Sequence, residues 1–110
     1  MPVLHELLSR HYRPSGHRLG IMVSAGCSEV DTALCEETLR AHGQAPLRRL
    51  ARLHPRPGGP ALDAAEYADF LRRYGHEYCV AWLPAVDGTA EITAAAREAG
   101  CAVGFYPPRS

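Results

Sequence analysis

The sequence predicts a three-layer α/β sandwich around a mostly parallel sheet of about four strands. Strand-like and helix-like segments alternate along the chain in the order β-α-(β)-α-β-α-β, behind an N-terminal helix. Between residues 78 and 106, a strand, a loop, a helix and a second strand follow one another, which is the connection that links parallel neighbours. This order indicates a Rossmann- or flavodoxin-like fold.

The N-terminal half predicts a short helix, a strand and a longer helix. Residues 3–12 carry apolar side chains at helical spacing, and we assign 1–17 to an N-terminal helix and arm. Alternating apolar residues over 19–25 predict the first strand. Ser28 can cap the next helix, which Gly43 ends.

The C-terminal half is clear except at its start. The segment 44–61 is compatible with a strand or a helical turn, and 54–61 forms a Pro/Gly-rich loop. The next helix begins at Asp63, which can form a capping box with Glu66. Its apolar stripe consists of Tyr67, Phe70, Leu71 and Tyr74, which we expect in the core. The remaining segments are a strand over 78–83, a helix from Thr89 to Gly100 and a strand over 101–106.

Composition sets limits on the class of protein. The 110 residues fit one domain, so we treat 1–110 as a single α/β domain. The net charge is zero, which gives no support for a nucleic-acid or membrane partner. All twelve basic residues are Arg, so no lysine is available for Schiff-base or Walker-type chemistry. The four cysteines lack zinc-finger spacing, so we expect no metal site and a reduced, cytoplasmic protein.

Three loops are predicted at the carboxyl edge of the strands, where α/β domains bind ligands. Two of these loops lead into helix N-termini, whose backbone N–H groups favour anions such as phosphate. A phosphate-bearing small molecule is therefore the expected ligand. The candidate binding residues in these two loops are Ala25, Gly26, Cys27, Asp87, Gly88 and Thr89.

Glu91 stands at the start of the last predicted helix and has two interpretations. An acid in a first helical turn is stabilised by the helix dipole and is common there. A positioned carboxylate can also act as a covalent nucleophile at an anomeric carbon. Spacing does not decide between them.

The segment Gly88-Thr89-Ala90-Glu91-Ile92, followed by Ala95, Gly100 and Val103, resembles the nucleoside 2-deoxyribosyltransferase-like family. The resemblance implies a nucleoside or nucleotide N-glycosidase or deoxyribosyltransferase in which Glu91 attacks C1′ of the sugar. It further implies that Gly88 and Thr89 contact the sugar or its 5′-phosphate, and that Asp69 belongs to the catalytic set. A nucleoside or nucleotide ligand, no cofactor and a homo-oligomer are expected on this basis.

Two alternatives remain beside this enzyme. The same fold can serve as a non-catalytic nucleotide-binding or sensing module, or as an oligomeric interaction protein. Cys27, between a strand and a helix, also resembles the phosphocysteine loop of sugar-phosphotransferase IIB domains, where a helix N-terminus activates the thiol. Glu29 and Asp31 follow Cys27 and would repel a phosphoryl group, which disfavours this alternative.

Overall fold

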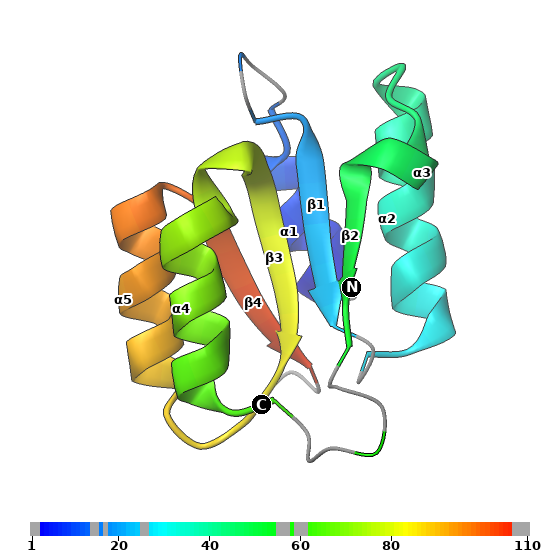
Figure 1. The fold of residues 1–110 in the computed structure, drawn as a ribbon. Coiled ribbons are helices and arrows are strands. Elements are labelled where there is room, and N and C mark those ends of the chain that lie inside the picture. The colour runs from blue at the N-terminus through cyan, green and yellow to red at the C-terminus, as the bar shows by residue number, and fades with distance from the viewer. Residues whose placement is uncertain are drawn as a thin grey trace.

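A computed structural model describes residues 3–13, 16, 18–24, 27–54, 58 and 62–106. It confirms the predicted fold class, with a four-stranded sheet in the order β2-β1-β3-β4 (Figure 1). Every neighbouring pair of strands is parallel, so the carboxyl ends of all the strands lie at one edge. The strands are β1 (Gly20–Ser24), β2 (Leu50–Leu53), β3 (Tyr78–Pro84) and β4 (Ala102–Tyr106).

Helices cover both faces of the sheet. The helices are α1 (Val3–His11), α2 (Glu29–Ala41), α3 (Pro46–Arg49), α4 (Ala64–Tyr74), the 3₁₀ turn η1 (Gly75–Glu77) and α5 (Thr89–Ala99). The α4 and α5 helices lie on one face, and α1 and α2 lie on the other (Figure 1). None of the described helices is long and apolar enough to cross a membrane.

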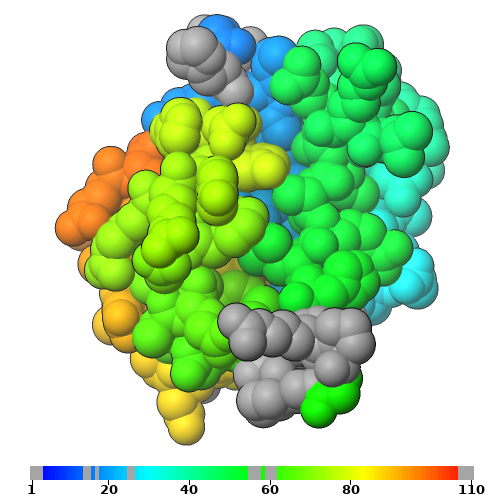
Figure 2. Space-filling model, in the orientation of Figure 1, coloured from blue at the N-terminus to red at the C-terminus, as the bar shows by residue number. Residues whose placement is uncertain are grey.

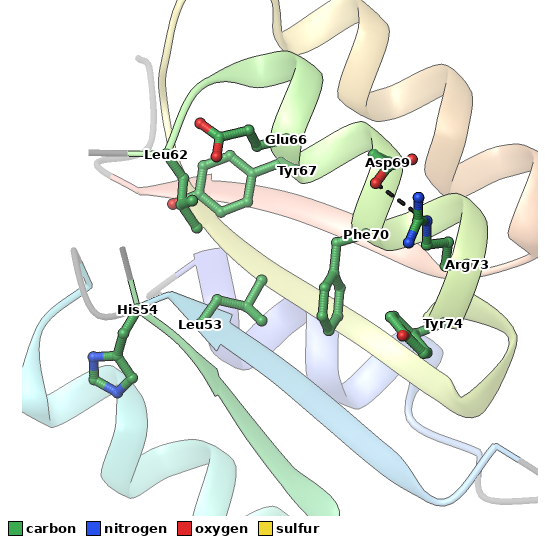
Figure 3. A pocket seen from close by; sticks show the side chains of 9 residues that line it. All are labelled: Leu53, His54, Leu62, Glu66, Tyr67, Asp69, Phe70, Arg73 and Tyr74. Carbon is green, nitrogen blue, oxygen red and sulfur yellow. Dashed lines mark ion pairs between the residues drawn. The ribbon is translucent and has the colours of Figure 1, made fainter. Parts of the chain in front are cut away.

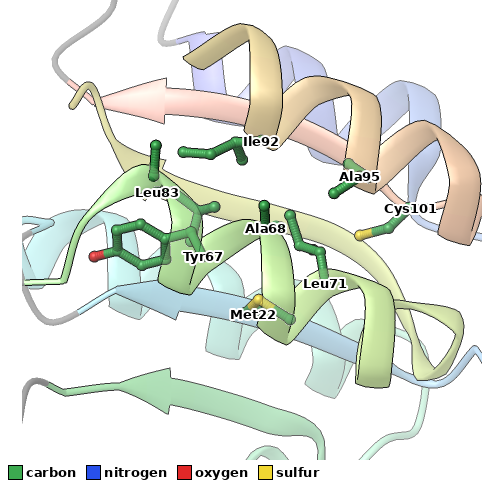
Figure 4. Packing of buried hydrophobic residues seen from close by; sticks show 11 residues of the cluster. Met22, Tyr67, Ala68, Leu71, Leu83, Ile92, Ala95 and Cys101 are labelled. Carbon is green, nitrogen blue, oxygen red and sulfur yellow. The ribbon is translucent and has the colours of Figure 1, made fainter. Parts of the chain in front are cut away.

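The central strands divide the core into two clusters. On the α4/α5 face, Met22 and Leu83 pack under the two helices (Figure 4). Ala81 belongs to the same cluster. On the opposite face, Val80 and Trp82 pack against α1 and α2. Because both faces are covered, β1 is buried at all five positions. Alternate side chains of β1 therefore point into the two different clusters, and neither set points to solvent.

The α2 and α4 helices begin at the capping residues that the sequence predicted. The Ser28 hydroxyl accepts a hydrogen bond from the N–H of Asp31 at 3.2 Å and caps α2. Asp63 and Glu66 form a reciprocal capping box at the start of α4. These caps fix where each helix leaves the carboxyl edge of the sheet.

Arg18 holds the C-terminus of α5 in place. Its guanidinium donates hydrogen bonds to the carbonyl oxygens of Ala99 at 2.7 Å and Gly100 at 2.9 Å. These are carbonyls that a helix C-terminus leaves without an internal partner, and a cation is favourable beside them. Arg18 thereby joins the segment before β1 to the last helix.

The structure resolves one open prediction and corrects another, and a third concerns residues that it does not describe. The segment left open between strand and helical turn contains both, since α3 leads directly into β2. Tyr74 is 43% exposed, so its placement in the core was wrong, because it lies at the end of α4 beyond the packed turns. Most of the 54–61 loop lies outside the described residues, as do Ala25 and Gly26.

Candidate functional site

A buried hydroxyl pair marks the carboxyl end of β1. The Ser24 hydroxyl lies 2.8 Å from the phenol oxygen of Tyr67 on α4, and both side chains are buried. Burial raises the pKa of Tyr67, and the hydrogen bond with Ser24 opposes that shift. The phenol is therefore neutral at physiological pH. This hydrogen bond joins α4 to the end of β1 and places two buried hydroxyl groups at the carboxyl edge of the sheet.

Cys27 lies between β1 and α2. Its N–H donates to the Ser24 carbonyl at 3.0 Å, and its thiol lies 3.6 Å from the Trp82 carbonyl. Burial, together with the nearby Asp31 carboxylate, raises the pKa of the thiol to about 11. The thiol is thus protonated near neutral pH, and a nucleophilic phosphocysteine role for Cys27 has no support.

Asp31 has a partner that the sequence did not indicate. Its carboxylate accepts a hydrogen bond from the indole N–H of Trp82 at 2.9 Å. Trp82 is buried in β3, so the contact joins the first turn of α2 to the centre of the sheet. Asp31 therefore has two roles. Its N–H donates to the capping hydroxyl of Ser28, and its carboxylate accepts the hydrogen bond of the buried indole N–H of Trp82. No periodic pattern links residues 31 and 82, and only the folded chain brings them together.

The loop before α5 is built around Gly88. The residue has φ 94°, in the left-handed region, and a Cβ added there would lie 2.7 Å from the Cβ of Ala64. Gly88 is thus required for the close approach of the α5 start to α4. Asp87 and Glu91 are exposed. The Glu91 N–H donates to the Gly88 carbonyl at 3.0 Å, and within the described ranges the Glu91 carboxylate has no hydrogen-bond or ion-pair partner. The Thr89 carbonyl accepts a hydrogen bond from the Thr93 hydroxyl at 2.8 Å.

A pocket of about 320 Å³ lies between β2 and α4 (Figure 3). Figure 2 shows this face in space-filling form, with α4 (yellow-green) and the β2 segment (green) side by side. The volume is at the lower end of the range, about 300–1,000 Å³, that is typical of small-molecule sites. Aromatic, aliphatic and charged side chains share the lining, which consists of Leu53, His54, Leu62, Glu66, Tyr67, Asp69, Phe70, Arg73 and Tyr74.

The predicted site residues separate into two places. Asp69 lines the pocket, where its exposed carboxylate forms an ion pair with Arg73 at 3.2 Å (Figure 3). Glu91 and Gly88 belong to the start of α5 and do not line this pocket. The structure therefore does not place Asp69 and Glu91 in one pocket. In the part of the chain that is described, no group of three or more His, Cys, Asp or Glu residues could hold a metal ion.

Comparison with known proteins points to a different family from the one expected. No protein-family model matches the chain. Over 109 residues, the chain is 32% identical to the kynureninase of Myxococcus xanthus, covering 93% of this chain and 26% of that protein. It is 34% identical to the kynureninase of Salinispora tropica (93% and 25%) and 28% identical to that of Yarrowia lipolytica (93% and 25%). The chain thus spans about a quarter of the length of the curated relatives it matches.

These matches overturn the resemblance to nucleoside 2-deoxyribosyltransferases, which was wrong. The N-glycosidase and deoxyribosyltransferase functions lose their basis with it, and the nucleotide-sensing and interaction-protein alternatives gain no better support. The physical reason lies in the motif itself. A glycine with positive φ followed by an acid in the first helical turn is a general solution for entering a helix from a parallel strand. The motif therefore does not by itself identify a nucleoside 2-deoxyribosyltransferase.

Proposed function

We propose that this chain is a kynureninase-like α/β segment that binds a kynureninase-type substrate but does not carry out the reaction with its own residues. The observation that carries the proposal is the identity of 32% and 34% to two kynureninases across 93% of the chain. The match covers nearly the whole described fold rather than one of its elements.

The cofactor of these relatives gives the second half of the proposal. Kynureninase is a pyridoxal-phosphate-dependent enzyme, and such enzymes hold the cofactor as a Schiff base on a lysine. These 110 residues contain no lysine, because all twelve basic residues are Arg. Arg cannot substitute, since its guanidinium stays protonated. The residues present therefore do not fit a covalently held pyridoxal phosphate, and a reaction that involves this chain takes its lysine from elsewhere.

The pocket between β2 and α4 supports a binding role. Kynurenine is an aromatic amino acid, and the pocket offers the rings of Tyr67, Phe70 and Tyr74 for its aromatic part. Arg73 and Asp69 supply one positive and one negative group for the charged ends of an amino acid. The rigid Ser24–Tyr67 pair holds the inner wall in place.

Two measurements on the purified chain test this function. Kynurenine is added with and without pyridoxal phosphate, and its loss is followed by chromatography. In separate samples without kynurenine, a Schiff base on the protein is sought by near-ultraviolet absorbance of the desalted chain after borohydride reduction. We expect no loss of kynurenine and no reduced adduct. Calorimetry should detect kynurenine binding that Phe70→Ala weakens and that Leu47→Ala, 96% exposed and outside the pocket, leaves unchanged. Turnover by the chain alone, or an absence of binding, would refute the proposal.

We further propose a cytoplasmic location for this chain. All four cysteines are free. This supports a reducing compartment such as the cytoplasm, where disulfides are rare.

A further inference from the structure

The pocket between β2 and α4 has polar groups at two separate ends. His54 follows β2 at the carboxyl edge of the sheet, whereas Asp69 and Arg73 lie on the later turns of α4 (Figure 3). Because α4 begins at the carboxyl edge and runs back along the sheet, the two ends are separated along the helix axis. Glu66, in the first turn of α4, precedes Arg73 by seven positions, which correspond to about 10 Å along the axis.

The lining between these two ends is apolar. Leu53 of β2 and Phe70 of α4 lie in the middle of the pocket (Figure 3). Both side chains are partly buried, since they also pack against the core cluster on the α4/α5 face. A charged group is unfavourable beside such a surface, and an aromatic ring is favourable. The pocket therefore suits an elongated ligand that has a ring in its middle and a polar group at each end.

The two ends differ in the groups that they can bind. Asp69 and Arg73 are 61% and 67% exposed, and an exposed ion pair of this kind contributes little to stability. A ligand with one ammonium and one carboxylate can therefore replace the two partners at small cost. At the other end, Glu66 is engaged in the capping box with Asp63. The imidazole of His54 is exposed and has no hydrogen-bond partner in the described part of the chain, and its neutral form offers one acceptor nitrogen.

We propose that His54 sets the ligand preference of this pocket by accepting a hydrogen bond from the ring amino group of kynurenine, while Asp69 and Arg73 bind the amino-acid end. The inference rests on the proposed function and adds to it an orientation and a specificity-determining residue. Kynurenine has the required form, because its ring carries an amino group and is joined through a ketone to an amino-acid end. In the opposite orientation, the ammonium and the carboxylate would both lie beside His54, which cannot match two opposite charges.

Two ligands that differ by one group test this orientation. β-Benzoylalanine is kynurenine without the ring amino group, and it keeps the ring, the ketone and the amino-acid end. Calorimetry on the purified chain should show that kynurenine binds about threefold to tenfold more tightly, which is the effect of one hydrogen bond. His54→Ala should remove this preference by weakening kynurenine alone, whereas Asp69→Asn should weaken both ligands by a similar factor. His76→Ala is the matched control and should change neither, because His76 is exposed and lines a different pocket.

The outcomes separate this inference from the function on which it rests. If the wild type binds neither ligand, the proposed function is refuted and the inference falls with it. If kynurenine binds without a preference over β-benzoylalanine, or if the preference persists in His54→Ala, the binding role stands and the role of His54 is overturned. Equal weakening of both ligands by His54→Ala would indicate the opposite orientation and would also overturn it. In the wild type, the NMR signals of the His54 ring should shift more with kynurenine than with β-benzoylalanine, and equal shifts would contradict the proposed hydrogen bond.

Discussion

Replacing Gly88 with alanine tests whether the glycine before α5 is needed for structure. The residue has φ 94°, and the new Cβ would lie 2.7 Å from the Cβ of Ala64, which is buried at the start of α4. Two separate penalties are expected. One comes from placing a side chain on a left-handed backbone, and the other from forcing apart two helices that are already in contact.

The size of each penalty can be worked from this geometry. A left-handed conformation costs a residue with a Cβ about 1–2 kcal/mol. Overpacking a well-packed contact costs about 1–3 kcal/mol. The free energy of unfolding should therefore fall by about 2–5 kcal/mol in Gly88→Ala. Gly43→Ala is the matched control, because Gly43 has φ 75° but no atom within 4 Å of the added Cβ, so only the first penalty applies.

Urea unfolding followed by circular dichroism measures the difference between the two variants. Gly88→Ala should lose about 1–3 kcal/mol more than Gly43→Ala. Adding Ala64→Gly to Gly88→Ala removes the clashing methyl group and should recover part of that difference, as a coupling in a double-mutant cycle. Equal losses in the two single variants, or no coupling with Ala64→Gly, would refute the packing argument.

Three further predictions concern the carboxyl edge. Tyr67→Phe removes the hydrogen bond to Ser24 and should lower the unfolding free energy by about 1 kcal/mol, whereas Tyr74→Phe should change it little. Asp31→Ala leaves the indole N–H of a buried tryptophan without its acceptor, so urea unfolding should show a loss of about 1–3 kcal/mol together with a shift in tryptophan fluorescence. Burial raises the pKa of Cys27 from 9.0 to about 11, so between these pH values the unfolded chain binds fewer protons than the folded one. The unfolding free energy should therefore fall as the pH rises through this window, with a smaller slope in Cys27→Ala; a pH-independent stability would contradict the burial of this thiol.

The fold was predictable because its signals are local. A capping box such as Asp63 with Glu66 lies within four consecutive residues, and it determines a helix start without help from the rest of the chain. A glycine such as Gly100 reports a backbone conformation that other residues avoid. The order of strands and helices then leaves few ways to build a parallel sheet.

The candidate site was not predictable by the same route. The contacts that define it join Ser24 to Tyr67 and Asp31 to Trp82, which are 43 and 51 positions apart. No spacing rule connects such residues. The one local motif at the edge, around Glu91, has the same appearance whether it carries chemistry or only starts a helix. The similarity to kynureninases emerged only from comparison over 109 residues with whole proteins.

The bond from Arg18 to α5 has a consequence for the order in which the chain acquires its structure. Arg18 and the carbonyl of Ala99 are separated by 81 positions, so this helix end is completed only when the segment before β1 has already reached it. During synthesis, Arg18 is made well before α5, so this contact cannot form until α5 has been made. Closing so long a loop is also slow compared with forming a helical turn. The α5 helix should therefore become stable in the same step in which the segment before β1 packs against it.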